Sequence, residues 1–170
     1  MNSRDGIIGL AIGDAMGVPL KFMEREKLLE NPVTDMTDGG IFDKEKGVWS
    51  ESTSLTLATI ESIIHCFGIS ITDMGNKFVS WMQNSEYTAT GARFDIGRTT
   101  MIALSRFQKE GQPFDSGSVA EDSNGNDILG RMLPIAYYAH ASNLQQSEIY
   151  SLVKKVAGVT HAHELSVLGA

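Results

Sequence analysis

The sequence contains little cysteine and no cluster of basic residues. Cys66 is the single cysteine, so an internal disulfide framework is excluded and a reducing, cytoplasmic setting is favoured. Because Cys66 lies within an apolar helical pattern, we expect it to be a buried structural thiol. The 14 basic residues are outnumbered by 21 acidic ones, for a net charge of −7, and only Lys154 and Lys155 are adjacent. This balance argues against a nucleic-acid-binding surface.

Long apolar runs are also missing. The run over residues 7–12 is short, is followed by Asp14 and lacks a basic leader, so we expect neither a secretion signal nor a membrane span. With 170 residues, of which 42% are hydrophobic, the chain is long enough to bury a core. We therefore expect one soluble domain over residues 1–170.

The apolar residues that are present repeat at helical spacing. Four stripes predict helices: Ile8, Ala11, Ile12 and Ala15, ended by Pro19; Ile60, Ile63, Ile64 and Phe67, ended by Gly68; Met74, Phe78, Trp81 and Met82; and Ile149, Leu152, Val153 and Val156, ended by Gly158. Further helices are predicted over residues 99–110, closed by Gly111 and Pro113, and over 128–139, whereas 31–47 is predicted to be a loop. No alternating strand pattern is present, so the fold is predicted to be all-α, with the Trp and Met stripe in its core.

Three glycines share one face of the first helix. Gly9, Gly13 and Gly17 are four residues apart, and each weakens a helix by about 1 kcal/mol relative to alanine. We therefore expect another helix or a ligand to approach this backbone closely.

A polar, acidic cluster begins the helix that follows Trp49. Ser50 or Ser52 could cap this helix, and Glu51 is favourably placed near its positive dipole end, where a cation could be held. Capping alone would also account for these residues. Two polar loops, over 87–97 and 117–127, suit ligand contact, and the second could aim backbone N–H groups at a phosphate or be an ordinary turn.

Five segments, taken in order, resemble the ADP-ribosylglycohydrolase family. They are GLAIGDAMGVP at 9–19 with Phe22, GVWSEST at 47–53, DIGRTT at 95–100, SNGN at 123–126 with Arg131 and Pro134, and THAH at 160–163. The resemblance implies a compact fold of orthogonal helices and a metal-dependent hydrolase that removes ADP-ribose from proteins or small molecules. It also implies two bound cations, Mg²⁺ or Mn²⁺.

The metal motif departs from the family pattern. The resemblance places metal ligands at Ser50, Glu51 and Ser52, where the family has Thr-Asp-Asp. Ser52 lacks a carboxylate, and Mg²⁺ tolerates little error in its oxygen ligands, so we expect metal binding to be weakened or absent. Lys21 stands where the family has an acidic residue, and Asp127 adds a negative charge where the family's loop approaches the diphosphate.

The resemblance also implies the other site residues. The catalytic candidates are Glu51, Asp14 and Asp95, and the candidates for substrate binding are Asp95, Gly97, Asn124, Gly125, Asn126 and His161. Glu51 would have to serve both as metal ligand and as base for water, two roles that one carboxylate does not readily combine. The remaining histidines, His65, His140 and His163, are expected on helix faces or at a helix start.

The family's other metal ligands lie in an Asp-rich cluster beyond the Thr-His motif, and this sequence contains no such cluster. We therefore expect the N-terminal half of a longer fold, with impaired or lost activity, that self-associates or binds a complementing C-terminal segment through exposed apolar surface. Three alternatives stay open: a working hydrolase, a non-catalytic module that binds ADP-ribose or a nucleotide, and a protein-interaction module.

Overall fold

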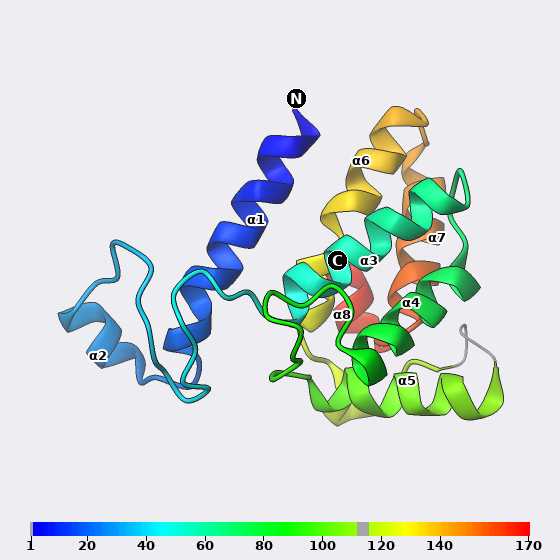
Figure 1. Cartoon of the computed structure of the whole chain (residues 1–170). Helices are drawn as coiled ribbons and strands as arrows, with labels where there is room; N and C mark the ends of the chain where they lie inside the picture. The colour runs from blue at the N-terminus through cyan, green and yellow to red at the C-terminus, as the bar shows by residue number, and fades with distance from the viewer. Residues whose placement is uncertain (1, 112–115) are drawn as a thin grey trace.

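The computed structural model describes residues 2–111 and 116–170, and within them the chain folds into helices (Figure 1). The α-helices are α1 (Ser3–Gly17), α2 (Arg25–Glu30), α3 (Glu51–His65), α4 (Ile71–Asn84), α5 (Arg98–Glu110), α6 (Leu133–Ala141), α7 (Gln146–Ala157) and α8 (Glu164–Gly169). Short 3-10 helices add η1 (Val18–Leu20), η3 (Glu121–Ser123) and η4 (Asp127–Arg131). The described residues form no strand, only two isolated bridges, so the predicted all-α fold is confirmed.

The core forms around α3. This helix contacts α1, α4, α6 and η4, and Figure 1 shows it between α1 on one side and α4 on the other. Met74, Phe78 and Trp81 of α4 are at most 1% exposed, so the predicted Trp and Met stripe is confirmed as core. Leu55 of α3 and Leu104 of α5 complete the centre of this cluster.

The helix predicted from the stripe of Ile60, Ile63, Ile64 and Phe67 is confirmed as α3, but this stripe is not the buried face of the helix. Ile60 and Ile63 are only partly buried, and Ile64 and Phe67 are exposed. The opposite face is buried instead, although it carries hydroxyl residues. Thr56 and Thr59 each donate a hydrogen bond to the backbone carbonyl four residues earlier, at 2.7 Å, which satisfies their hydroxyl groups inside the helix. Because the hydroxyls are satisfied locally, the polar face can pack against α4 and η4.

Cys66 is exposed, which corrects the prediction of a buried thiol. Helix α3 ends at His65, and the next residues turn sharply, with a positive φ of 51° at Phe67. The apolar pattern that includes Cys66 therefore runs past the end of the helix, and its last residues lie in a surface turn.

The glycine face of α1 is open. Nothing in the described chain lies within 4 Å of a Cβ built on Gly9, Gly13 or Gly17, so the predicted close approach of another helix is not found. The close approach occurs instead at Gly6, where a Cβ would lie 2.0 Å from the hydroxyl oxygen of Tyr137 in α6. The helix therefore packs at Gly6 on one side and, near its end, through Ala15 and Asp14, while its glycine face is left uncovered.

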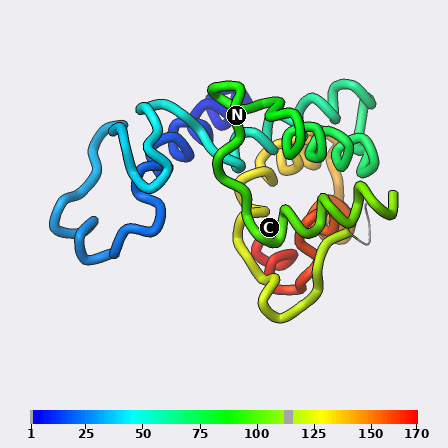
Figure 2. The backbone as a smooth tube through the Cα atoms, turned by 60° about the horizontal axis from the view of Figure 1, so that its bottom comes forward, coloured from blue at the N-terminus to red at the C-terminus, as the bar shows by residue number. Residues whose placement is uncertain are grey.

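Residues 18–47 form an N-terminal arm that projects to one side of the helices (Figure 2). Helix α2, within the arm, buries none of its residues. The predicted loop over 31–47 is confirmed, and it folds back onto η1 at Gly40. A Cβ at Gly40 would lie 2.5 Å from the Cα of Pro19, and its φ is +71°, so this position requires glycine.

The later helices follow the predicted boundaries closely. Helix α5 ends at Gly111, which adopts the left-handed conformation typical of a C-terminal cap, while Pro113 lies outside the described residues. Helix α7 ends before Gly158, as predicted. The segment predicted as one helix over 128–139 is divided into η4 and α6, because Pro134 begins a new helix. Among the described residues, no helix has the length and apolar character needed to cross a lipid bilayer.

The exposure of Cys66 leads to a simple prediction. The native protein should react with an aromatic disulfide reagent at a rate close to that of the urea-unfolded chain, because the sulfur is already accessible. Absorbance of the released thiolate measures the rate, and Cys66→Ser serves as the blank. A native rate many-fold slower than the unfolded rate would mean that the thiol is buried.

Candidate functional site

The Asp14 carboxylate, near the end of α1, caps the N-terminus of α3. Its Oδ2 accepts hydrogen bonds from the backbone N–H of Ser50 at 3.0 Å and from the N–H and hydroxyl of Thr53 at 2.9 and 2.7 Å. Its Oδ1 accepts from the hydroxyl of Ser50 at 2.6 Å. The Ser50 side chain occupies the cap position but makes no capping bond. The expected cap by Ser50 or Ser52 is therefore replaced by a carboxylate from another helix, which also suits the helix dipole.

Glu51, the first residue of α3, binds the N-terminus of α5 in a similar way. Its Oε2 accepts from the backbone N–H of Gly97 at 2.7 Å, and its Oε1 accepts from the hydroxyl of Thr100 at 2.6 Å. Burial raises the pKa of Glu51, the two hydrogen bonds oppose this shift, and the nearby carboxylates of Asp127 and Asp95 add to it. Both carboxylate oxygens are thus engaged by protein donors.

Ser52 lies against η4. A Cβ at Gly130 would be 2.5 Å from the Ser52 hydroxyl oxygen, so η4 approaches α3 as closely as a glycine permits. The Thr56 hydroxyl also donates to the carbonyl of Gly130 at 2.6 Å. This contact holds the loop of residues 124–127 next to the start of α3.

Asp95 is buried beside the same helix start, and it forms an ion pair with Lys21 from the N-terminal arm. Asp95 lines a small cavity together with Trp49, Ser50 and Glu51, and the volume of this cavity is only about 10 Å³. A cavity of this size holds at most one water molecule. The residues of the predicted metal motif are therefore packed against one another.

The donors of this motif do not fit two divalent cations. Ser50 donates to Asp14, both oxygens of Glu51 accept from α5, and Ser52 offers no carboxylate. Mg²⁺ requires near-octahedral oxygen ligands at fixed distances, and Mn²⁺ also prefers carboxylate oxygens. Among the described residues, the motif Ser50, Glu51 and Ser52 therefore offers a single carboxylate, that of Glu51, where two divalent cations need several oxygen ligands.

One other grouping of possible ligands occurs in the part of the chain that the structure describes. His65, Cys66 and Asp73 place ligand atoms within 4.8 Å of one another, at the opposite end of α3 from the motif. The Nδ1 atom of His65 and the Oδ1 atom of Asp73 are 3.2 Å apart. This pair is a surface contact between α3 and α4, as expected for a histidine on a helix face.

A second polar cluster lies on the other side of η4, around the buried Arg131. Its guanidinium donates to the carbonyl of Val156 at 3.2 Å and to the hydroxyl of Thr160 at 2.7 Å, and it stacks 4.9 Å from the ring centroid of Phe78. Burial lowers the pKa of Arg131 to about 10, so the group stays charged at neutral pH. The two hydrogen bonds of Arg131 hold the end of α7 and the segment that follows it in place.

This cluster sets the tautomer of His161. Thr160 Oγ1 and His161 Nδ1 are 2.9 Å apart. Because Thr160 accepts from Arg131, its own proton is available, and we assign that proton to the bond with Nδ1, which places the histidine proton on Nε2. Burial, together with the positive charge of Arg131, lowers the pKa of His161 to about 4, so the ring is neutral at pH 7. His161 therefore presents an N–H donor.

The Nε2–H group of His161 points toward the loop that precedes η4. It is buried and has no hydrogen-bond partner among the described residues. It lies 3.5 Å from where a Cβ of Gly125 would be and 3.9 Å from Oδ2 of Asp127. Since the ring is neutral, the contact with Asp127 is not an ion pair at pH 7. A buried donor without a partner is unusual in a folded protein, and it marks this loop as a place where a ligand acceptor fits.

The predicted site residues are therefore only partly brought together. Gly97 adjoins both Glu51 and Asp127, because a Cβ on it would lie 3.6 Å from the first carboxylate and 2.7 Å from the second. Asp95 contributes to the electrostatic field at Glu51. Gly125 is held by its carbonyl, which accepts from Ser166 at 3.0 Å. The flanking residues of this loop, Asn124 and Asn126, are exposed.

Sequence reasoning assigned no role to Thr53, Thr100 or Arg131. The two threonines lie in the first turns of α3 and α5, where hydroxyl side chains are common. Arg131 gave no local signal, because its burial depends on contacts with Phe78 and Thr160 that are distant in sequence. His163 is the N-cap of α8 and accepts from the N–H of Leu165 at 3.2 Å, so its predicted place at a helix start is confirmed.

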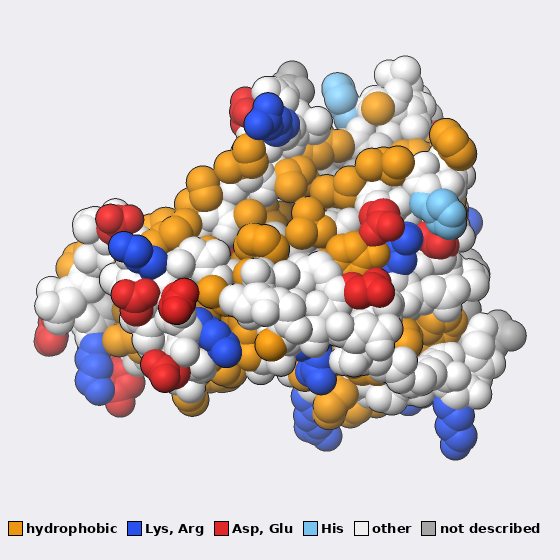
Figure 3. All heavy atoms as spheres, in the orientation of Figure 1, with side chains coloured by type: hydrophobic (Ala, Val, Ile, Leu, Met, Phe, Trp, Pro, Cys, Tyr) orange, Lys and Arg blue, Asp and Glu red, His pale blue; other side chains and the backbone are white. Residues whose placement is uncertain are grey.

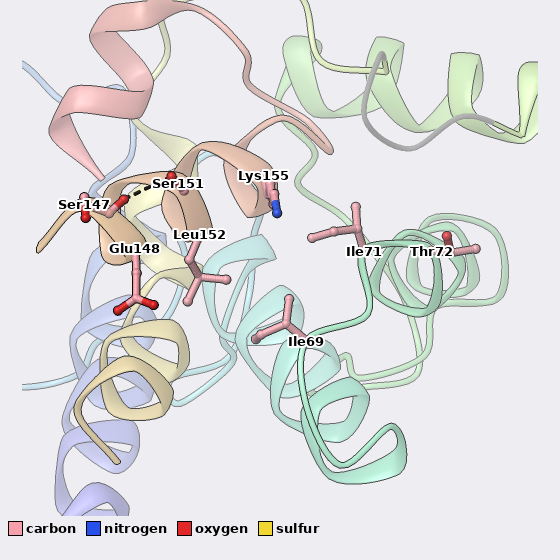
Figure 4. Close-up of a pocket in the computed structure, with 8 residues that line it drawn as sticks. All are labelled: Ile69, Ile71, Thr72, Ser147, Glu148, Ser151, Leu152 and Lys155. Atoms are coloured by element: carbon pink, nitrogen blue, oxygen red, sulfur yellow. Dashed lines mark hydrogen bonds between the residues drawn. The ribbon is translucent and has the colours of Figure 1, made fainter. Parts of the chain in front are cut away.

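Two of the larger hollows in the described chain lie away from the predicted site residues. One of about 590 Å³ separates the start of α4 from α7, and Figure 4 shows its lining residues: Ile69, Ile71, Thr72, Ser147, Glu148, Ser151, Leu152 and Lys155. The other, of about 530 Å³, is an apolar groove between α1, α3 and α6, where Figure 3 shows hydrophobic side chains gathered. Its lining includes Ile60, Ile63 and Ile64 of α3, which are exposed or partly buried. None of the predicted site residues lines either hollow.

Comparison with known proteins gives a consistent result. A family model described as ADP-ribosylglycohydrolase matches residues 2–170. The chain is 36% identical over 140 residues to an ADP-ribosylarginine hydrolase Tri1 of Serratia proteamaculans (strain 568), a match that covers 82% of this chain and 37% of that protein. It is 26% identical over 163 residues to an ADP-ribosyl-(dinitrogen reductase) glycohydrolase of Rhodospirillum rubrum, covering 94% and 51%.

A solved chain described as an ADP-ribosylglycohydrolase-related protein complex shares the fold, with a TM-score of 0.75 at 23% identity. That match covers 98% of this chain and 51% of the other. The chain thus spans about half the length of the proteins that it matches, and little more than a third of the Serratia relative.

The capping role of Asp14 predicts a graded loss of stability. Asp14→Ala removes all four hydrogen bonds and should lower the free energy of unfolding by about 2–3 kcal/mol. Asp14→Asn keeps one acceptor oxygen without the charge and should lower it by about 1 kcal/mol. Urea titration followed by circular dichroism measures both, and Asp5→Asn, on the exposed start of the same helix, should change stability by less than about 0.5 kcal/mol. Equal effects of Asp14→Ala and Asp5→Asn would contradict the cap.

The lowered pKa of His161 predicts a pH dependence with a defined sign. The unfolded chain binds a proton at this histidine near pH 6.5 and the folded chain only near pH 4, so stability is lost as pH falls between these values. From pH 7.5 to 5 the wild type should lose about 2 kcal/mol more stability than His161→Gln. The raised pKa of Glu51 makes stability fall as pH rises, but it is present in both the wild type and His161→Gln. His140→Gln, which removes an exposed histidine, should follow the wild type, and parallel curves for wild type and His161→Gln would refute the assignment.

Proposed function

Because this chain belongs to the ADP-ribosylglycohydrolase family, we propose that it recognises the ADP-ribose group of an ADP-ribosylated protein or small molecule, with hydrolysis impaired or lost. The observation that carries this proposal is the unpartnered Nε2–H donor of His161, which is buried and points toward the Gly125 loop. A ribose hydroxyl or a phosphate oxygen would supply the missing acceptor. The proposed substrate-binding residues remain Asp95, Gly97, Asn124, Gly125, Asn126 and His161.

The proposal of impaired hydrolysis is supported by the hydrogen bonds and the ion pair that the acidic residues make. Asp14 accepts four hydrogen bonds from the start of α3, Glu51 accepts two from the start of α5, and Asp95 is paired with Lys21. A carboxylate that acts as a base must be free to accept a proton from water. Metal dependence is general in this family. The motif residues of this chain offer one carboxylate, that of Glu51, whose two oxygens already accept hydrogen bonds, and this supports the proposal that hydrolysis is impaired.

Asp127 shapes which part of the ligand fits. Its carboxylate lies 3.9 Å from the His161 donor and adjoins Gly97, so it places negative charge at the mouth of the loop. A diphosphate would be repelled there, whereas a hydroxyl group can donate to the carboxylate and accept from the histidine. We therefore propose that a ribose hydroxyl of ADP-ribose occupies this position.

The apolar groove between α1, α3 and α6 and the open glycine face of α1 support a further part of the proposal. Large apolar side chains such as Ile8, Ile12 and Ile64 are 45–67% exposed there. Since the relatives are about twice as long or longer, we propose that a complementing C-terminal segment, or a second copy, covers this surface. In that case residues 1–170 form one partial domain. A hydrolase completed by such a segment is the alternative function.

A cytoplasmic location also remains part of the proposal.

A thermal-shift titration with ADP-ribose tests the proposed function. A ligand that binds only the folded state raises the melting temperature, so ADP-ribose should stabilise the wild type without added metal. His161→Phe, which removes the N–H donor and keeps a ring, should weaken binding at least about tenfold, in line with the loss of one buried hydrogen bond. His140→Gln, an exposed change on α6, is the matched control. No shift at saturating ADP-ribose, or an equal shift in wild type and His161→Phe, would count against the proposal.

Hydrolysis is measured separately. Release of ADP-ribose from a peptide that carries ADP-ribosylated arginine, the linkage named for the Serratia relative, should be absent or very slow with and without Mn²⁺. Rapid release that requires Mn²⁺ would favour the completed-hydrolase alternative instead.

A further inference from the structure

Three different kinds of metal ligand meet on the surface where α3 ends and α4 begins. His65 is the last residue of α3, Cys66 follows it, and Asp73 lies in the first turn of α4. One ligand atom from each side chain lies within 4.8 Å of the ligand atoms of the other two. An imidazole nitrogen, a thiol sulfur and a carboxylate oxygen are therefore gathered at one point, at the opposite end of α3 from Glu51.

The backbone on both sides of this cluster is held by hydrogen bonds. The N–H of Cys66 donates to the carbonyl of Ser62 at 2.9 Å, and the turn that follows has a positive φ of 51° at Phe67. At the far side of the turn, the Ser70 hydroxyl accepts from the N–H of Asp73 at 3.3 Å and caps α4. The three ligands therefore come from one short segment whose two ends are anchored in helices.

The Asp73 carboxylate turns one oxygen toward the cluster. Its Oδ1 lies 3.2 Å from Nδ1 of His65, whereas its Oδ2 is buried and has no hydrogen-bond partner among the described residues. The ammonium group of Lys77, one turn further along α4, is paired with Glu61 at 3.3 Å, so its positive charge is balanced by a different carboxylate. Asp73 is thus oriented as a ligand that binds through a single oxygen.

The spacing of these atoms suits a tetrahedral zinc ion. Bonds of about 2.0–2.3 Å to nitrogen, oxygen and sulfur place neighbouring ligand atoms about 3.3–3.6 Å apart. Nδ1 of His65 and Oδ1 of Asp73, at 3.2 Å, are already close to this separation. The Cys66 side chain is exposed, so rotation about its χ1 can bring the sulfur, which is within 4.8 Å, to the same distance.

We propose that His65, Cys66 and Asp73 bind a zinc ion, with water in the fourth position. Thiolate and imidazole ligands favour Zn²⁺, whereas Mg²⁺ and Mn²⁺ prefer oxygen, so this site differs in chemistry from the one expected at residues 50–52. On binding, the thiol releases its proton, and zinc replaces the proton that lies between Nδ1 and Oδ1. The bound ion joins the end of α3 to the start of α4. The inference does not depend on ADP-ribose recognition, because none of the three residues belongs to the proposed binding residues.

Cobalt(II) tests the proposal, because it occupies zinc sites and reports its ligands by absorbance. The wild type should develop the near-ultraviolet charge-transfer band of a cobalt–thiolate bond as Co²⁺ is added to the reduced protein, and Zn²⁺ should abolish this band by competition. Cys66→Ser should show no band. His65→Gln and Asp73→Asn should each need at least about tenfold more Co²⁺ for half-saturation. His140→Gln, which removes an exposed histidine on α6, is the matched control and should bind as the wild type does.

A relocated thiol distinguishes a site with three ligands from binding by a thiol alone. In a Cys66→Ser background, Ser105→Cys places a single thiol on an exposed position of α5, and it should give no band at the Co²⁺ concentration that saturates the wild type. A second measurement uses Cys66 itself. Zn²⁺ should slow its reaction with the aromatic disulfide reagent at least about tenfold, and a chelator should restore the metal-free rate.

Two results would overturn the zinc site. One is the absence of a cobalt–thiolate band at a large molar excess of Co²⁺ over the folded wild type. The other is equal affinity in the wild type, His65→Gln and Asp73→Asn, with circular dichroism showing that each is folded, because the metal would then be held by the thiol alone. Failure of ADP-ribose to stabilise the wild type would leave these results unaffected and would count only against the proposed function.

Discussion

The binding of side-chain carboxylates to helix N-termini is the constraint on which the rest of this structure depends. Asp14 fixes the start of α3 by accepting from Ser50 and Thr53. That start carries Glu51, which in turn fixes the beginning of α5 through Gly97 and Thr100. Three helices are thereby linked in series by charged hydrogen bonds, each favoured by the helix dipole. The positions of Ser50, Glu51, Gly97 and Thr100 follow from this chain of contacts.

Two separate sets of contacts position the candidate site. Asp14 and Glu51 hold the starts of α3 and α5 through hydrogen bonds. The His161 donor belongs to a different cluster, whose geometry is set by Arg131 and Thr160 and does not involve these carboxylates. The two sets of contacts share no residue.

The sequence predicted the helical fold and the core stripe of α4 well, because Met74, Phe78 and Trp81 repeat at the helical period and have no polar function to satisfy. It predicted helix α3 but not its buried face, because Thr56 and Thr59 bond to their own helix and can be buried in place of Ile64. It failed at Cys66, because periodicity does not show where a helix ends. The ordered motifs indicated that Glu51, Gly97, Gly125 and His161 belong to one site. Only the folded chain shows which hydrogen bonds their atoms make, since partners such as Asp14 and Lys21 are far away in sequence.

The Asp14 and Glu51 contacts share one further property, which is their direction along the chain. Asp14 precedes the residues that it binds by 36 and 39 positions, and Glu51 precedes its partners by 46 and 49. During synthesis from the N-terminus, each carboxylate leaves the ribosome before the helix start that it caps. Helix α3 can therefore be capped as it emerges, and once in place it offers the cap for α5. The order of translation is thus also an order in which these helices can be assembled.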